Sequence, residues 1–426
     1  SYNPYVKVSI LKVEENKDVN EYIKNFCEKI KKYNVVVFTE IQPMYFLAQV
    51  DKVCRSNNIK LIYGVCLGLA GYVFSDFGEE HTILDETGEE PKTYIVKSIS
   101  KDKEGLVIID NIQGTNNLKL GDEDYVRFEN VEGMTELNDK DKIFKIKFID
   151  YQSFCIGDKS EFGDYIKGGD IYEVKIPKKK NYFDFCARSA MISDRMHPFN
   201  IPDITKKGRS ELLYMAFSGV HDFYFQNKFT LPELNNMEQA RKILENVRQM
   251  YNQVKAQNIP WYSQIQEFDE KIVLNVARWA AANIPPVCGF FGGILAQEII
   301  KATGKYTPID QWFIHDFFEV VENIKDDADR TLKNCRYDDQ IAIFGNEIQE
   351  KIQKSNIFMV GAGATGCEFL KNFGMMGFCS DKNALFTVVN KYKGLLSEQT
   401  GGYQVKEPIK GRIGGSPVNY DGNTNI

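Results

Sequence analysis

Three glycines near the end of the chain have the spacing of a nucleotide-binding turn. Gly361, Gly363 and Gly366 fit the pattern G-x-G-x-x-G; a strand-like apolar run, 357–360, precedes them, and a helical pattern begins at Ala364. Glycines let a backbone approach phosphates closely, and a helix N-terminus offers free N–H groups with a partial positive charge. The motif alone is weak evidence, but its place between a strand and a helix favours nucleotide binding over a merely tight turn.

The turn itself does not distinguish ATP from NAD. In dinucleotide-binding folds an acidic residue after the next strand holds the ribose hydroxyls. Here the expected second strand covers residues 384–389, and the residue that follows is Asn390. An amide can hydrogen-bond a hydroxyl without charge assistance, so Asn390 is the candidate ribose contact. An NAD-dependent oxidoreductase is one alternative, although it predicts an acid at this position and a catalytic His or Lys nearby.

The cysteines and histidines offer little for metal chemistry. The nine cysteines are widely scattered with no C-x-x-C pair, and only four histidines are present. This pattern predicts no metal site and suits reduced thiols in the cytoplasm or nucleus. Cys367 lies inside the nucleotide turn, and we expect it to be a small buried thiol that packs the helix against the sheet.

Length and charge set broad limits on the molecule. A chain of 426 residues suggests about three domains. The net charge of −6 argues against a protein that mainly grips nucleic acid, and no apolar run is long enough to span a membrane. The sequence opens on Ser1 without a signal peptide, and we expect it to be an internal piece of something longer.

The pattern of apolar residues predicts an α/β chain with two other kinds of segment. Residues 34–39 and 59–64 are typical strands flanking a helix at 43–57, which is half of a doubly wound sheet. Between about 80 and 180, six short strands with turn signals predict a small β barrel or sandwich. Amphipathic stripes then predict a bundle of three or four helices, at 208–224, 237–254 and 267–282.

The chain resembles the eukaryotic ubiquitin-activating enzymes over residues 1–389. The resemblance rests on seven stretches that occur in the same order as in that family, which makes it specific. They are YNPYVKV near the start and residues 68–91, 124–134, 165–179, 290–312, 336–345 and 360–373.

The resemblance implies a ThiF/MoeB-like adenylation fold, with a doubly wound sheet, an inserted all-β module and a four-helix bundle. The implied domains are 1–80, the first part of an inactive adenylation domain; 81–180, a first catalytic-cysteine half-domain; 181–282, the four-helix bundle; 283–330, the second part of the inactive domain; 336–389, the start of an active adenylation domain; and 390–426, a divergent tail.

The function that the resemblance implies is ATP-dependent activation of ubiquitin. ATP and Mg²⁺ would serve to join the ubiquitin C-terminus to AMP, a cysteine would take the acyl group as a thioester, and a conjugating enzyme would receive it. Gly361, Gly363, Ala364 and Gly366 match the ATP cradle, and Asn390 falls where the family has a ribose-binding Asp.

Several parts of the family pattern are not matched after Val389. The magnesium ligands and the thioester cysteine are among them, so we expect no catalytic residue in this chain and an incomplete, inactive portion of the enzyme. We also expect a monomer whose partners are ubiquitin and conjugating enzymes, not nucleic acid or membrane. A non-catalytic ubiquitin-binding scaffold is the second alternative, because fold and function separate easily.

Overall fold

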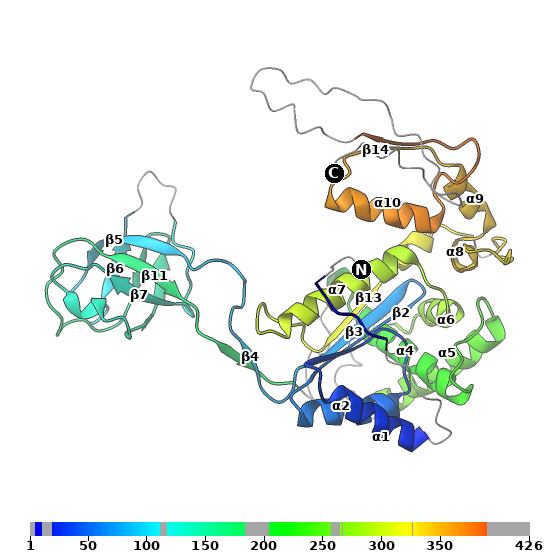
Figure 1. Cartoon of the computed structure of the whole chain (residues 1–426), viewed down its shortest axis with the longest axis horizontal. Coiled ribbons are helices and arrows are strands. Elements are labelled where there is room, and N and C mark those ends of the chain that lie inside the picture. Colours follow the sequence, from blue (N-terminus) through cyan, green and yellow to red (C-terminus); the bar gives the residue numbers. More distant parts are fainter. Residues whose placement is uncertain are drawn as a thin grey trace. The chain divides into compact units, whose positions relative to one another are not determined.

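The computed structural model describes most of the chain and divides it into two compact units, which Figure 1 shows with their elements labelled. The described residues are 5–10, 19–110, 117–182, 184, 204–256, 265, 267–325 and 327–389. The first unit comprises residues 1–78, 183–299 and 309–426 as far as they are described, and the second comprises 79–182 and 300–308.

A four-stranded sheet forms the centre of the first unit. Its strands, in spatial order, are β1 (Val35–Phe38), β2 (Lys60–Leu67), β3 (Ala70–Asp76) and β13 (Trp312–Asp316). β1 and β2 are parallel and are joined through α2 (Met44–Ser56), as the strand–helix–strand pattern predicted. The described sheet is mixed, because a two-residue turn at Gly68, with φ +65°, makes β3 antiparallel to β2.

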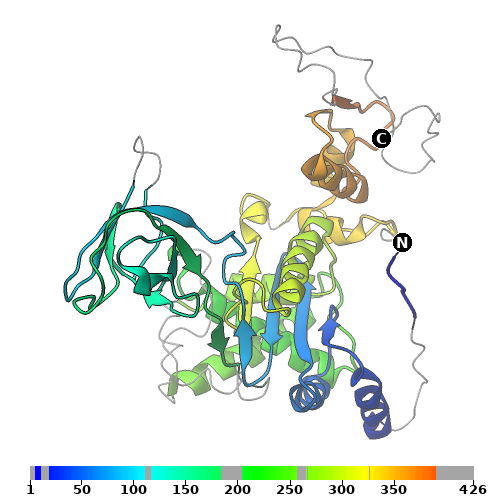
Figure 2. The same cartoon turned by 60° about the vertical axis from the view of Figure 1, so that its left-hand side comes forward.

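Helices cover both faces of this sheet (Figure 2). On one face, α7 (Pro285–Lys301) approaches so closely that an added Cβ at Gly64 would lie 2.8 Å from Leu295. On the other face, Tyr72 of β3 packs against Phe217 of α4 (Arg209–Gln226). α1 (Val19–Ile30) packs with α2 against β1 and the start of β2. The first unit is therefore an α/β structure.

Three described helices pack on one another in the first unit. They are α4, α5 (Met237–Ala256) and α6 (Glu270–Trp279), which correspond to the three helical stretches expected from sequence. α4 and α5 meet closely, since an added Cβ at Gly219 would lie 2.4 Å from Val247. Residues 185–203, which were also expected in this bundle, lie outside the described residues.

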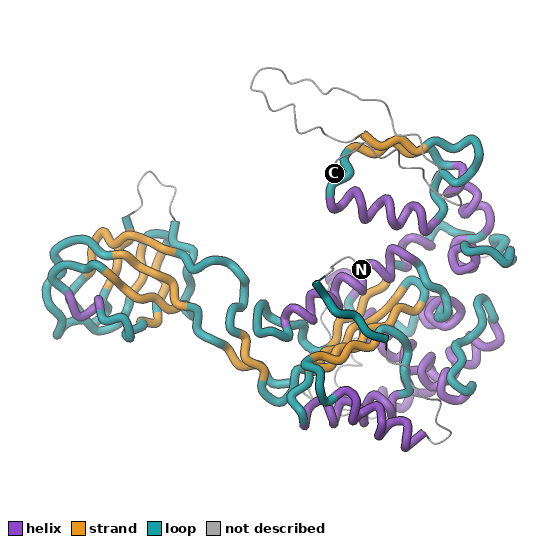
Figure 3. The backbone as a smooth tube through the Cα atoms, in the orientation of Figure 1, coloured by secondary structure: helices purple, strands orange, loops and turns teal. Residues whose placement is uncertain are grey.

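A β barrel forms most of the second unit. Its strands are β5 (Thr93–Ile99), β6 (Leu106–Ile109), β7 (Tyr125–Glu129), β8 (Phe144–Lys145), β9 (Lys147–Asp150), β10 (Ser153–Cys155) and β11 (Asp170–Val174). The spatial order is β8-β7-β11-β5-β6-β10-β9. The two ends of this order, β8 and β9, are joined in the chain by the single residue Ile146, so the sheet closes on itself (Figure 3). The chain therefore bends at Ile146 between β8 and β9.

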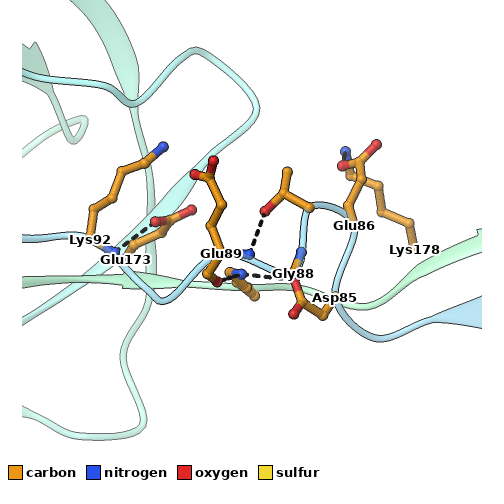
Figure 4. A network of polar contacts seen from close by, with 9 residues as sticks. Asp85, Glu86, Gly88, Glu89, Lys92, Glu173 and Lys178 are labelled. Carbon is orange, nitrogen blue, oxygen red and sulfur yellow. Dashed lines mark hydrogen bonds and ion pairs between the residues drawn. The ribbon is translucent and has the colours of Figure 1, made fainter. Parts of the chain in front are cut away.

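A short two-stranded neck leads into the barrel. β4 (His81–Ile83) pairs with β12 (Lys178–Lys180), with Lys180 opposite His81. Polar contacts continue this pairing toward the barrel (Figure 4). The Lys175 ammonium donates to Asp85 at 2.7 Å, and this hydrogen bond lowers the pKa of the Asp85 carboxyl. Lys178 likewise donates to Glu86 at 2.6 Å.

The last described elements belong to the first unit. They are α8 (Asp338–Phe344), α9 (Asn346–Lys354), β14 (Ile357–Val360), α10 (Ala364–Met376) and β15 (Phe386–Val389). Short 3-10 helices occur at Thr135–Asn138, Ile204–Lys206 and Phe318–Val321. Among the described residues, no helix is long and apolar enough to cross a membrane.

Candidate nucleotide-binding turn

The glycine motif lies between two parallel strands, as a nucleotide-binding turn requires. β14 pairs in parallel with β15, with Val360 opposite Val389, and α10 forms the crossover between them. The Gly361 N–H donates to the Val389 carbonyl at 2.7 Å, which extends the pairing by one residue. The N-terminus of α10 therefore stands at the carboxyl end of both strands, where ligands of such sheets bind.

Each of the three motif glycines has a distinct structural role. Gly361 has φ +98°, a region that favours glycine strongly. Gly366 lets the helix pack on the turn, because an added Cβ would lie 2.5 Å from the Gly361 carbonyl oxygen. Gly363 is the N-cap of α10 in extended conformation, and an added Cβ there would meet nothing within 4 Å. Gly361 and Gly366 are thus needed by the fold, whereas Gly363 leaves open space.

The open space at Gly363 fits a phosphate group. Gly363 and Ala364 are exposed, and Gly361 and Gly366 are partly exposed. The first N–H groups of a helix have no acceptor within the helix, and the helix dipole favours an anion at this end. The four glycine and alanine residues expected at the cradle therefore come together in one accessible turn, and their backbone suits phosphate oxygens.

The structure corrects the expectation for Cys367. Its side chain is exposed, and its thiol lies 3.6 Å from the Ala362 carbonyl oxygen. Cys367 follows Gly366 in the first turn of α10 and faces solvent, so it does not pack the helix against the sheet. The sequence had suggested burial because cysteines are usually buried, and nothing in the local pattern marks this position as the outer side of the turn.

The described residues do not include the ribose contact expected beside this turn. Asn390 lies outside the described residues, so its expected ribose contact stays a prediction. Within the described part of the chain, no group of three or more His, Cys, Asp or Glu residues could hold a metal ion. Apolar side chains beside the turn are open to solvent, with Phe358 67% and Val360 73% exposed. Sequence reasoning had not predicted this open surface.

Comparison with family models matches two segments of the chain. The ThiF family model matches residues 337–385, which span α8 to the end of the crossover after α10. The model of the ubiquitin-activating enzyme E1 FCCH domain matches residues 102–175, which cover most of the barrel.

Curated relatives match most of the chain. Ubiquitin-like modifier-activating enzyme 1 of Oryctolagus cuniculus is 36% identical over 364 residues, which are 84% of this chain and 33% of the relative. The protein of the same name from Dictyostelium discoideum is 37% identical over 370 residues, 85% of this chain and 34% of the relative. Ubiquitin-activating enzyme E1 2 of Triticum aestivum is 36% identical over 372 residues, again 85% and 34%. The chain thus spans about a third of the length of these relatives.

The parallel strand–turn–helix and the matching family model make residues 337–385 a segment of the ThiF family, with its adenylation fold. The match of residues 102–175 to the FCCH domain model, and the 36% identity over 84% of the chain, extend the similarity beyond this segment. The chain is related to the ubiquitin-activating enzymes, as its sequence had indicated.

Proposed function

We propose that this chain contributes to ATP-dependent activation of ubiquitin, and that the turn at residues 361–366 holds the phosphates of ATP. The observation that carries the proposal is the open helix N-terminus at Gly363, set between two parallel strands inside the ThiF segment. The backbone N–H groups of Gly363, Ala364 and Gly366 would bind phosphate oxygens. Asn390 would hydrogen-bond a ribose hydroxyl.

The chemistry proposed for the whole enzyme is adenylation followed by thioester formation. A carboxylate is a poor electrophile at neutral pH, and ATP, when bound, supplies the AMP group that makes the ubiquitin C-terminus reactive. A cysteine outside this chain would then accept the acyl group, and a conjugating enzyme would receive it. Mg²⁺ would neutralise phosphate charge, but its ligands would come from residues other than those described. We further propose a monomer acting in the cytoplasm and nucleus.

The phosphate cradle is tested with Gly363→Ala. The added methyl meets no protein atom, and φ of −76° suits alanine, so the folded structure should be retained. The same methyl occupies the side from which phosphates would approach. We expect at least a tenfold loss of ATP affinity, measured by equilibrium dialysis of the purified chain with radiolabelled ATP, and a melting temperature close to that of the wild type.

Gly289→Ala is the matched control, because Gly289 also has open space around its Cβ position but lies on α7. It should leave ATP affinity unchanged. Equal ATP affinity in the wild type and Gly363→Ala would contradict the cradle. Undetectable ATP binding by the wild-type chain would also contradict the cradle.

The complete reaction is not expected from this chain alone. Among the described residues there is no acidic cluster for a metal ion, and the chain matches only about a third of its relatives. Pyrophosphate exchange driven by ubiquitin should therefore stay at background. Clear exchange by the purified chain would show that it holds a working adenylation site.

A further inference from the structure

Two cysteines that are far apart in the sequence lie on facing surfaces of the first unit. Cys66 is on β2 between Gly64 and Gly68, and side chains alternate along a strand, so Cys66 points to the same face of the sheet as Gly64. Gly64 is the residue that meets Leu295 of α7. The face that carries Cys66 is therefore the face covered by α7.

Cys288 lies on the side of α7 that contacts this face. Residues 288, 291 and 295 follow the spacing of one helix face, and Phe291 and Leu295 are both buried. Phe291 lies over Gly71, whose added Cβ would be 2.7 Å from its ring. Gly71 is the direct partner of Cys66 in the β2–β3 pairing. Strand register and helix periodicity thus bring the two cysteines together.

The two thiols contact each other. They form a side-chain hydrogen bond, and both residues are only partly buried. The hydrogen bond from Cys66 lowers the pKa of the Cys288 thiol to about 7, while it raises the pKa of the Cys66 thiol. Cys288 is therefore the more readily ionised member of the pair, and thiolates are the form that oxidants attack.

Backbone contacts hold the two segments in register around the thiols. The Gly68 N–H donates to the Ala282 carbonyl at 3.2 Å, and Gly68 forms a parallel bridge with Asn283. The end of β2 is thus tied to the segment just before α7. A disulfide between Cys66 and Cys288 would need only a local approach of two thiols that already form a hydrogen bond.

We propose that Cys66 and Cys288 form a redox-active dithiol that is oxidised to a disulfide by hydrogen peroxide or small organic hydroperoxides. The Cys288 thiolate attacks one peroxide oxygen, the O–O bond breaks, and Cys288 becomes a sulfenic acid as hydroxide leaves and is protonated to water. The Cys66 thiol then attacks the Cys288 sulfur, the S–O bond breaks, and the Cys66 proton passes to the departing oxygen, which leaves as a second water. Two thiols and one peroxide thus give one disulfide and two waters.

The resulting disulfide would connect β2 to the start of α7 covalently. It would close a loop from residue 66 to residue 288, which contains part of the first unit and the whole described barrel, and long closed loops restrict the unfolded chain most. The oxidised first unit should therefore melt at a higher temperature than the reduced one. Trp279 and Trp312 both lie in this unit, so tryptophan fluorescence reports its unfolding.

The experiment treats the reduced full chain with equimolar hydrogen peroxide, blocks the remaining thiols, and maps peptides by mass spectrometry without reduction. The expected result is one cross-linked peptide pair containing Cys66 and Cys288, with the nine free thiols reduced to seven. The fluorescence melting temperature should rise by several degrees and return after reduction. A map in which this pair is absent, or in which Cys66 pairs with another cysteine, overturns the proposal.

Cysteine variants separate the role of Cys288, which reacts with the peroxide, from the role of Cys66, which forms the disulfide. Their readout is chemical labelling, which does not depend on the stability of the fold. In Cys66→Ser the Cys288 sulfenic acid has no partner, so its dimedone adduct should increase several-fold over wild type. Cys335→Ser removes an exposed thiol outside the pair and should leave the cross-link unchanged. Equal dimedone labelling of Cys288 in wild type and Cys66→Ser would show that Cys66 does not resolve the sulfenic acid.

Discussion

At the scale of single residues, His221 is the most informative buried group of the first unit. It lies on α4 with 6% of its surface exposed, and its Nε2 is 2.5 Å from the Tyr72 hydroxyl. The Tyr72 hydroxyl donates to Tyr63 at 3.0 Å, so it accepts from the Nε2–H of a neutral imidazole. Among the described residues, no hydrogen-bond partner faces Nδ1. A second proton on the ring would therefore be buried without an acceptor.

The state of His221 makes stability depend on pH. Burial lowers its pKa from 6.5 to about 4, so between these values the unfolded chain binds a proton that the folded chain does not. The contribution of His221 to the free energy of unfolding is therefore fully present above about pH 6.5. It is lost as the pH drops toward 4, and the total loss is about 3 kcal/mol. Urea unfolding followed by tryptophan fluorescence measures the effect, because the ring of Trp312 lies 5.6 Å from that of Tyr72.

His221→Phe is the comparison for this prediction, because it keeps a ring of similar size and removes the titrating group. As the pH falls from 6.5 to 4, the unfolding free energy of the wild type should fall by about 3 kcal/mol relative to that of the variant. A difference that is constant over this range would mean that His221 is already protonated in the folded chain.

Lys159 shows how the barrel accommodates a buried charge. Only 5% of the residue is exposed, and its ammonium donates to the carbonyl oxygens of Ile156 and Asp158, each at 3.0 Å. The rings of Phe144 and Phe162 lie 4.8 and 5.1 Å from the same nitrogen. Carbonyl dipoles and aromatic faces thus stabilise the ammonium inside the barrel.

Replacing this ammonium should destabilise the barrel. Lys159→Met keeps the apolar stem but leaves the carbonyl oxygens without their donor, at an expected cost of about 2 kcal/mol. The exposed Lys147→Met is the control and should change stability by less than about 0.5 kcal/mol. Circular dichroism in urea is the suitable measurement, because the second unit contains no tryptophan. Equal midpoints for the two variants would argue against this role.

At the scale of elements, closure of the barrel depends on the bend between β8 and β9. β8 pairs with β7 and β9 with β10, so the short segment 144–150 joins the two ends of the strand order. Ile146 stands at the bend with 2% of its surface exposed, and its N–H donates to the Asp124 carbonyl at 3.0 Å. Closure leaves this sheet without a long free edge.

Truncating the residue at the bend should weaken this closure. Ile146→Ala removes packing at a site surrounded by barrel core and should cost about 2–4 kcal/mol of barrel stability. Ile149→Ala, only three residues away and 48% exposed, should cost less than about 1 kcal/mol. Urea unfolding followed by circular dichroism compares the two, and equal losses would place Ile146 outside the core.

At the scale of the whole molecule, the chain consists of two units whose segments are interleaved in the sequence. The barrel begins and ends at the paired strands β4 and β12, where Lys179 also lies 2.9 Å from Glu80 as an ion pair. The two ends of residues 81–180 are therefore side by side. The second unit also includes residues 300–308, which the sequence had assigned to the rest of the inactive adenylation domain.

Deletion of residues 81–180 should leave the first unit folded. A short glycine linker can join Glu80 to Asn181, because Lys180 and His81 are direct strand partners. The deleted chain keeps every tryptophan, and its fluorescence should show one cooperative thermal transition near that of the full chain. Aggregation of every linker length, with no folded fraction, would show that the first unit depends on the barrel.

The sequence by itself determined the kinds of elements and the position of the candidate site. β1, α2, β2 and the turn at Gly361 were predicted near their observed bounds, and the region of the barrel was predicted as six short strands where the structure has seven. These features follow from side-chain alternation, helical spacing and glycine backbone freedom, which act between residues close in the chain. The resemblance to ubiquitin-activating enzymes was likewise carried by short local stretches, and the comparisons confirm it.

Only the tertiary structure decided which distant residues meet and which side chains face solvent. Trp312 pairs with Phe74, and Cys288 meets Cys66, across more than two hundred residues of chain in each case. The exposure of Cys367, the membership of residues 300–308 in the second unit and the closure at Ile146 also came from the structure. The physical reason is that burial and long-range contact depend on how whole elements pack, and one sequence pattern is compatible with several such packings.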